Sequence, residues 1–324
     1  MRRIATAALL IALTMITAPF PARAADYPDR PIRMVVPYPP GGVLDTSARI
    51  IGRKLGSLLG QQIVIENKPG ASGTLGAATV VKADADGYTL LLTTGDLVTM
   101  PSLLPAATFD SNKDLLPIAM VGSAPMALVA NVNAPFNNAK ELVAAAKAAP
   151  GTISYGIPGI GTINHVAAEW FFHAAGIKLQ PVPYRGSAQL VNSVAAGDIP
   201  LGIIAPSTAK SLVEAHKLKV IGLSGKRRPS FLPASWATFA ESGFDVDALL
   251  WIGVFAPVGT PEPIMKRIGE ELARATADPE VKKLLNTAGI DVENMAQPEF
   301  GKYIRMDTAR YDDIIRKTGI QIKR

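Results

Sequence analysis

Cysteine is absent from this sequence, and aromatic residues make up only 6% of its 324 positions. Without cysteine the chain can form no disulfide, no thiolate metal site and no cysteine nucleophile. Its folded state must therefore depend on buried apolar surface. The composition, 48% hydrophobic and 19% charged, is typical of a globular protein. A chain of this length can bury one core and favours two, because single cores stop growing at about this size.

Long apolar runs are missing beyond the N-terminus. There, Arg2 and Arg3 precede an apolar run from Ile4 to Ile16, and Ala22-Arg23-Ala24 has the small-x-small pattern of a cleavage site. The run is too short to span a bilayer. We therefore predict a signal peptide at residues 1–24, which directs export and is cleaved after Ala24. A retained membrane anchor is the alternative interpretation.

A strong excess of one charge is missing as well. The formal net charge is +6, but removing Arg2, Arg3 and Arg23 leaves 30 basic and 27 acidic residues, a net charge of +3. The basic triplet Lys226-Arg227-Arg228 stands in a region with few aromatic residues, which is typical of a solvated loop. We therefore predict no nucleic-acid partner.

Strand-like and helix-like segments alternate along most of the remaining chain, which indicates an α/β fold with sheets of the parallel type. The predicted strands are Ile32–Val36, Ile63–Ile65, Tyr88–Leu92, Pro117–Val121, Ala127–Asn131, Ile153–Tyr155, Leu179–Val182, Leu201–Ile204, Lys219–Leu223 and Leu249–Phe255. The predicted helices are Thr46–Leu59, Gly73–Val81, Lys140–Ala148, Ile163–Ala175, Ser187–Ala196, Thr208–His216, Pro261–Ala277, Pro279–Thr287 and Pro298–Lys317.

The last three predicted helices follow one another almost without strands, so they lack a sheet of their own. We expect them to pack back onto the first half of the chain. This predicts a discontinuous domain 1, residues 25–125 plus 252–324, and a domain 2 at residues 126–251. Two crossings, near Ala124–Leu128 and Ala248–Val254, would then form a hinge that closes two lobes around a ligand.

Two glycine-rich turns of the same design are the most informative feature of the chain. The first runs from Pro39 to Asp45 as Pro-Pro-Gly-Gly-Val-Leu-Asp, and the second runs from Gly156 to Thr162 as Gly-Ile-Pro-Gly-Ile-Gly-Thr. Each follows a predicted strand and opens a predicted helix. Such a turn directs backbone N–H groups and the positive end of a helix at one point, which favours a small anion. Two such turns predict an anion held between two lobes.

Further motifs occur around these turns in a specific order. They are Pro37-Tyr38-Pro39-Pro40-Gly41-Gly42, Asp45, Arg49, the run from Glu66 to Gly76, Asp86-Gly87-Tyr88-Thr89-Leu90, Gly159-Ile160-Gly161-Thr162, His165, Pro183-Tyr184-Arg185-Gly186 and Trp251-Ile252-Gly253-Val254-Phe255-Ala256-Pro257. In this order they resemble the Bug-type receptors, the periplasmic substrate-binding proteins of tripartite tricarboxylate transporters, over essentially the whole exported chain.

The resemblance implies a two-lobed periplasmic binding protein of the type II-like, Venus-flytrap kind, in which each lobe is a mixed sheet flanked by helices. It implies a periplasmic location, a small organic acid as ligand and the membrane subunits of such a transporter as partners. A periplasmic receptor that signals to a sensor kinase ectodomain is the alternative, and a secreted hydrolase is a third interpretation.

The candidate ligand-binding residues come from both turns and from loops expected beside them. They are Tyr38, Pro40, Gly41, Gly42, Val43, Leu44, Asp45, Thr93, Thr94, Ile157, Gly159, Ile160, Gly161, Thr162, His165 and Arg185. For the glycines, a role as anion donors and a purely conformational role are both open. Asp45 is favoured as a helix cap. Arg185 is either a carboxylate clamp or a brace behind the loop, and Asp96 is interpreted as a solvated turn residue.

Three of these positions depart from the usual family pattern. Val43 and Leu44 replace residues that are often polar, and Ile157 stands where serine is common. The ligand contacts must then come mainly from the backbone. We therefore predict a monocarboxylate or dicarboxylate with an apolar or aromatic body.

Patterns typical of enzymes are missing from the sequence. Ser72 lacks the Gly-x-Ser-x-Gly spacing of a nucleophile elbow, and His165 with Glu169 makes no His-Glu-x-x-His zinc pattern. The second turn lacks the glycine spacing of a dinucleotide-binding loop. We predict a binding protein with no catalytic residue, no metal and no cofactor.

Overall fold

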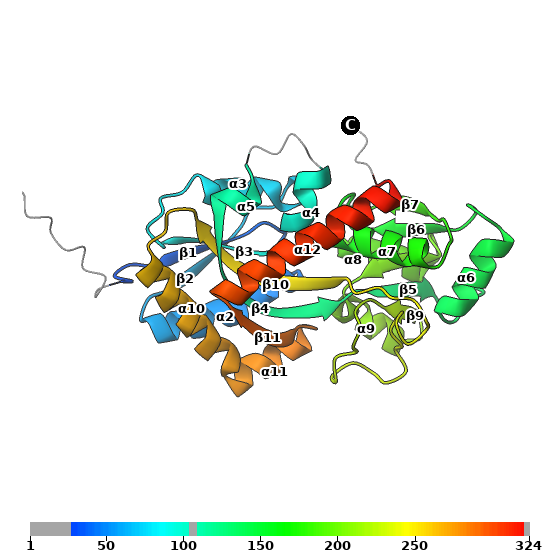
Figure 1. Cartoon of the computed structure of the whole chain (residues 1–324). Coiled ribbons are helices and arrows are strands. Elements are labelled where there is room, and N and C mark those ends of the chain that lie inside the picture. The colour runs from blue at the N-terminus through cyan, green and yellow to red at the C-terminus, as the bar shows by residue number, and fades with distance from the viewer. Residues whose placement is uncertain (1–26, 104–108, 321–324) are drawn as a thin grey trace, which may run out of the picture.

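The computed structural model describes residues 27–103 and 109–320. The predicted signal peptide therefore lies outside the described residues. Two β-sheets form the centres of two lobes, with strand orders β11-β4-β10-β3-β1-β2 and β7-β6-β8-β5-β9. Figure 1 shows these lobes side by side, with β4, β10 and helix α12 running between them.

The first lobe contains the six-stranded sheet. Its strands are β1 (Ile32–Val36), β2 (Ile63–Asn67), β3 (Thr89–Thr94), β4 (Leu115–Pro125), β10 (Leu249–Pro257) and β11 (Asp291–Ala296). Its helical elements are α2 (Val43–Leu59), η2 (Ala71–Gly73), α3 (Thr74–Val81), α4 (Asp96–Leu103), α5 (Ser111–Asp114), α10 (Glu262–Ala277), α11 (Pro279–Thr287) and α12 (Gln297–Thr318). Strand β1 is parallel to β2 and β3, while β10 and β11 are antiparallel to β4.

The second lobe contains the five-stranded sheet. Its strands are β5 (Ala127–Asn131), β6 (Ser154–Ile157), β7 (Gln180–Pro183), β8 (Leu201–Ile204) and β9 (Leu218–Leu223). Its helices are α6 (Ala139–Ala148), α7 (Ile163–Ala174), α8 (Ser187–Ala196) and α9 (Pro206–Glu214). Strand β6 is parallel to β7 and β8, and β5 is antiparallel to β8 and β9. Both sheets are mixed, as the family resemblance implied, and are not of the purely parallel type.

The chain crosses between the sheets at two adjacent places. Met126 alone separates β4 from β5, and the chain returns to the first sheet at β10. Ser224 joins the crossings, because its hydroxyl accepts a hydrogen bond from the Met126 N–H at 2.8 Å and donates one to the Ala248 carbonyl. A pair of strands tied in this way is a suitable hinge. The division into two domains at residues 125/126 and 251/252 stays our proposal.

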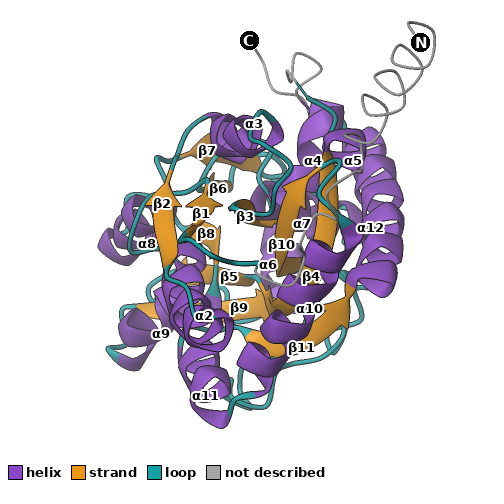
Figure 2. Ribbon diagram, turned by 90° about the vertical axis from the view of Figure 1, so that its left-hand side faces the viewer, coloured by secondary structure: helices purple, strands orange, loops and turns teal. Residues whose placement is uncertain are grey.

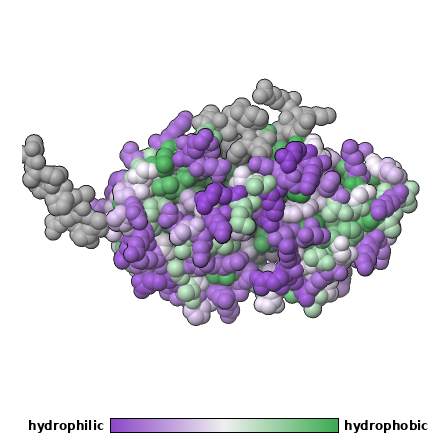
Figure 3. Space-filling model, viewed as in Figure 1, coloured by the Kyte–Doolittle hydropathy of each residue, from purple (hydrophilic) through white to green (hydrophobic). Residues whose placement is uncertain are grey.

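The C-terminal helices lie against the first lobe. Helices α10 and α11 contact α2, and α12 contacts β4, α4 and also α7 of the second lobe. Figure 2 shows the helices arranged around the two sheets. On the face of the molecule that Figure 3 shows, hydrophilic residues cover much of the surface. Within the part of the chain that the structure describes, no helix is both long and apolar enough to cross a membrane.

Strand β11 and the helices α4 and α5 were not predicted from the sequence. Strand β11 lies within the region expected to be almost entirely helical. Its sequence, Asp-Val-Glu-Asn-Met-Ala, is polar because it is an edge strand, so the usual pattern of a half-buried strand is weak. Helix α4 begins at Asp96, where the sequence predicted a loop at the cleft, and Thr93 and Thr94 are the last residues of β3.

Candidate functional site

The first glycine turn leaves the N-terminus of α2 without a side-chain cap. Gly41 has a φ of +83°, in the left-handed region that favours glycine, and the N-cap residue Gly42 has an extended backbone with no side chain to accept a bond. Both glycines are exposed. Among the described residues, the backbone N–H groups of Val43 and Leu44 have no hydrogen-bond acceptor. The positive end of α2 is therefore available to an external anion.

Asp45 holds this turn from inside the protein. Its carboxylate accepts bonds from the Gly41 N–H and the Asn67 side chain, each at 2.9 Å, and pairs with Arg49 at 2.9 Å. Burial tends to raise the pKa of Asp45, but the bonds from Arg49, Gly41 and Asn67 outweigh it and lower that pKa. Asp45 lies in the first turn of α2 and is not its N-cap, which corrects the predicted cap. It also binds the Gly41 N–H that was expected to face the ligand.

The second glycine turn is closed by its own side chains. Thr162 is the N-cap of α7, and its hydroxyl donates to the Gly159 carbonyl at 2.9 Å and accepts the His165 N–H at 3.5 Å. Gly161 has a φ of +80°, and its N–H donates to Nδ1 of His165 at 3.2 Å. The side chains of Thr162 and His165 are buried. These residues shape the turn. The N–H groups of Gly161 and His165 are already bonded within the protein, so they are not free for a ligand.

Asp96 connects the two turns. One oxygen of its carboxylate accepts a hydrogen bond from the Tyr38 hydroxyl at 2.6 Å, and the other accepts the Ile163 N–H, at the start of α7, at 2.8 Å. Thr99 adds a second link, because its hydroxyl donates to the Gly161 carbonyl at 3.2 Å. The two turns, which begin 117 residues apart in the chain at Pro39 and Gly156, are thus brought together at the junction of the lobes.

The position of Asp96 corrects the interpretation of this residue as a solvated turn residue. It is only 4% exposed. Burial raises its pKa, while the hydrogen bonds from Tyr38 and Ile163 act against that rise. A protein carboxylate therefore occupies the start of α7 in the way that a ligand anion would. The two turns are similar in sequence, but only the first leaves its helix start open.

The remaining candidates differ in how far they are exposed. Pro40 and Arg185 are exposed, Val43 and Ile160 are half-buried, and Leu44, Thr93, Thr94 and Ile157 are buried. Within the described ranges, the Arg185 side chain forms no ion pair, and only its backbone N–H is bonded, to Gln189 at 3.0 Å. These contacts give no support to Arg185 as a brace. Its role as a clamp stays a prediction.

Three residues that build this junction were not among the predicted site residues: Asn67, Asp96 and Thr99. Asn67 also donates to the Tyr38 carbonyl at 3.1 Å, so it fixes both ends of the first turn. A signal for Asp96 was present, since an acidic residue directly after an apolar strand is typical of a helix start. For Thr99 the sequence offers no comparable signal, because its partner is a backbone carbonyl in the other lobe.

His165 supplies a pH-dependent contribution to stability. Burial lowers its pKa from 6.5 to about 4. The unfolded chain therefore binds a proton that the folded protein does not, and stability falls as the pH drops from 6.5 towards 4, by about 3 kcal/mol in total. Urea unfolding at several pH values should show that His165→Gln loses this dependence, whereas the exposed His216→Gln keeps it. Equal pH profiles for the two variants would contradict the assignment.

Metal binding has no arrangement to support it among the described residues. No group of three or more His, Asp or Glu side chains there is placed to hold an ion. Glu169, four residues after His165, instead accepts a bond from the buried Tyr155 hydroxyl, and burial raises the pKa of its carboxyl. Glu169 therefore has a structural role, because it links α7 to the strand β6 that leads into the second turn.

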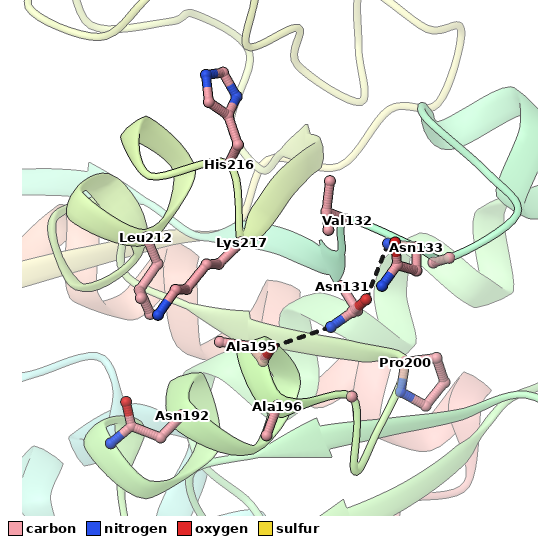
Figure 4. Close-up of a pocket in the computed structure, with 12 residues that line it drawn as sticks. Asn131, Val132, Asn133, Asn192, Ala195, Ala196, Pro200, Leu212, His216 and Lys217 are labelled. Carbon is pink, nitrogen blue, oxygen red and sulfur yellow. Dashed lines mark hydrogen bonds between the residues drawn. The ribbon is translucent and has the colours of Figure 1, made fainter.

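A separate cavity of about 750 Å³ lies in the second lobe, near the ends of β5, α8 and α9 (Figure 4). Asn131 is its most buried polar side chain, but the Asn131 amide donates to the Val194 carbonyl and its oxygen accepts the Asn133 N–H. His216 and Lys217 at the rim are exposed. The buried polar groups are thus satisfied within the protein, so the glycine turns remain the better candidate site.

Comparison with known proteins gives a consistent picture. Residues 47–320 match the model of the tripartite tricarboxylate transporter family receptor. The chain is 34% identical over 310 residues to a UPF0065 protein from the tcbD-tcbE intergenic region of Pseudomonas sp. strain P51, covering 94% of this chain and 91% of that protein.

Solved structures agree with the sequence comparison. The chain superposes on the periplasmic binding protein BugD with a TM-score of 0.82 and 30% identity, covering 92% of this chain and 100% of BugD. It superposes on Rpa4515 of R. palustris, solved with adipate, with a TM-score of 0.84 and 28% identity, covering 91% of this chain and 99% of that protein. The predicted two-lobed architecture is thereby confirmed.

Proposed function

The chain belongs to the tripartite tricarboxylate transporter receptor family, and from this membership we propose that it is a periplasmic receptor that captures a small organic carboxylate between its two lobes. The observation that supports the site is that the N-termini of α2 and α7 differ in whether a protein group already binds their free N–H groups. Asp96 already fills the start of α7, while the start of α2 at Gly42 has no cap.

Capture begins in this proposal at the first turn. A ligand carboxylate accepts the free N–H groups of Val43 and Leu44 at the positive end of α2. Rotation about the hinge strands β4 and β10 then brings the second turn over the ligand. Tyr38 and Asp96 align the two turns. In this proposal the first turn binds the ligand carboxylate, and the second turn forms the opposite wall of the ligand site.

The ligand class follows from the side chains beside the open helix start. Val43 in the first turn and Ile160 in the second are apolar and half-buried, and the buried Asp96 disfavours a ligand carboxylate directly at the start of α7. Adipate, the ligand of the related Rpa4515, joins two carboxylates by an apolar chain. We therefore propose a dicarboxylate or monocarboxylate with an apolar or aromatic body.

A thermal-shift screen of carboxylic acids, followed by calorimetry, tests this function. We expect adipate-like diacids or aromatic monoacids to raise the melting temperature in proportion to the logarithm of their concentration, because they bind only the folded protein. Citrate, which carries three charges, should bind at least about tenfold more weakly. A shift by sugars or cations without any shift by carboxylates would overturn the proposal.

Delivery to the membrane subunits of a tripartite tricarboxylate-type transporter completes the proposed function. Export by residues 1–24 would place the receptor in the periplasm beside them. Deleting its gene should abolish uptake of the identified acid. Retained uptake combined with lost transcriptional induction would instead favour the alternative, signalling to a sensor kinase. We further propose binding without turnover, so the acid should be recovered unchanged after incubation with the protein.

A further inference from the structure

A second cavity lies between the lobes, at a place separate from the glycine turns. Its volume is about 460 Å³, and its walls come from α9 and the 231–236 loop of the second lobe and from α11 of the first. Figure 1 shows α9 and α11 at the same lower edge of the molecule. In the first sheet, β11 after α11 and β1 before the first turn stand on opposite sides of β4 and β10. The residues that line the cavity include none from either glycine turn.

Two polar atoms in the walls lack partners. Ser207 Oγ and Asn286 Oδ1 are fully buried and have no hydrogen-bond partner among the described residues. Ser207 belongs to the second lobe and Asn286 to the first, and both line the cavity. Buried polar side-chain atoms are normally paired in folded proteins. The lining of each lobe thus contains a residue with an unpaired polar side-chain atom.

The charged residues that line the cavity are all basic. Lys210, Lys282 and Lys283 line it, none of the three forms an ion pair within residues 27–103 and 109–320, and no Asp or Glu is among the lining residues. Helix α9 begins here with Pro206 at its first position, and its N-cap Ala205 makes no side-chain bond. The positive end of α9 therefore adds to the field of the three lysines. This field selects an anion.

The wall from the 231–236 loop is apolar and aromatic. Trp236 is 6% exposed and lies beside Phe231 and Leu232 in the lining. Aromatic side chains of this kind pack well against flat or apolar groups. A cavity of about 300–1,000 Å³ with an apolar wall and a few polar groups is typical of a small-molecule site.

We propose that this cavity is a second binding site, for an organic anion with an apolar or aromatic body. The acid group binds Lys282, Lys283 and the start of α9, and the body packs on Trp236. Because one wall belongs to each lobe, the occupant contacts both α9 and α11. The site is independent of the carboxylate site proposed at the first turn.

Heteronuclear NMR of the full chain tests this site with phenylacetate as the probe. Trp236→Phe assigns the Trp236 indole signal among those of the three tryptophans. We expect phenylacetate to shift this signal and the Asn286 amide signals in a saturable way, and the uncharged phenylacetamide to bind at least about tenfold more weakly. The absence of a saturable shift at Trp236 would overturn the proposal.

Matched charge variants separate this site from a general effect of net charge. Lys282→Gln/Lys283→Gln should weaken binding by about tenfold, while Lys140→Gln/Lys147→Gln on α6 removes the same charge and should leave it unchanged. Equal affinities in the two double variants would contradict the proposal. Shifts at the Val43 amide report the first turn, so failure of either site can be recognised without the other.

Discussion

Gly42→Asp should stabilise the protein slightly and at the same time abolish carboxylate binding. Gly42 has the extended φ of −77° and ψ of 173° that suit an N-cap, and a Cβ there would meet only the Pro39 carbonyl, at 3.7 Å. An Asp side chain can therefore cap α2, which should add about 0.5 kcal/mol to the free energy of unfolding. Its charge would occupy the place of the ligand carboxylate, and we expect affinity to fall by at least about 100-fold.

Urea unfolding and calorimetry with the acid found by the screen measure the two effects. Gly42→Ala is the matched control, because it adds a Cβ without an acceptor or a charge, and its affinity should stay within about threefold of the parent protein. A stabilised Gly42→Asp variant that still binds the acid as tightly as Gly42→Ala would show that the ligand does not dock at α2.

Asp96→Ala should cause a large loss of stability, for a reason unrelated to ligand. It removes the acceptor of two buried donors, the Tyr38 hydroxyl and the Ile163 N–H. Each unsatisfied buried donor costs about 1–3 kcal/mol, so we expect the free energy of unfolding to fall by about 3 kcal/mol. Asp96→Asn keeps one acceptor oxygen, and its loss should be about half as large.

Added formate provides a direct test of the role assigned to the Asp96 carboxylate. Formate can enter the space vacated in Asp96→Ala and accept both donors, so it should raise the melting temperature of this variant more than that of the parent protein. Asp84→Ala, at an exposed position, is the control and should change stability by less than about 0.5 kcal/mol. Equal stability of the Asp96 and Asp84 variants would contradict the bridging role.

Much of the fold could be predicted because its signals are local. The α2 prediction was confirmed from the spacing of Ala48, Ile51 and Leu55, which are all buried. The edge strand β11 escaped prediction because edge strands tolerate polar residues, so the hydrophobic alternation that marks a strand is weak there. The start of α4 was missed because Gly95-Asp96 is equally typical of a turn.

The sequence by itself determined the α/β architecture, the family resemblance and the two glycine turns, since these depend on apolar periodicity, on residue order and on the backbone freedom of glycine. Only the tertiary structure decided that the turns are unequal. Asp96 lies 67 residues before Ile163 in the chain and reaches it only when the lobes pack together, so no local pattern could show that a protein carboxylate fills the start of α7. The open start of α2 is left for the ligand because burial and long-range hydrogen bonding, which act through the fold, have already satisfied the other turn.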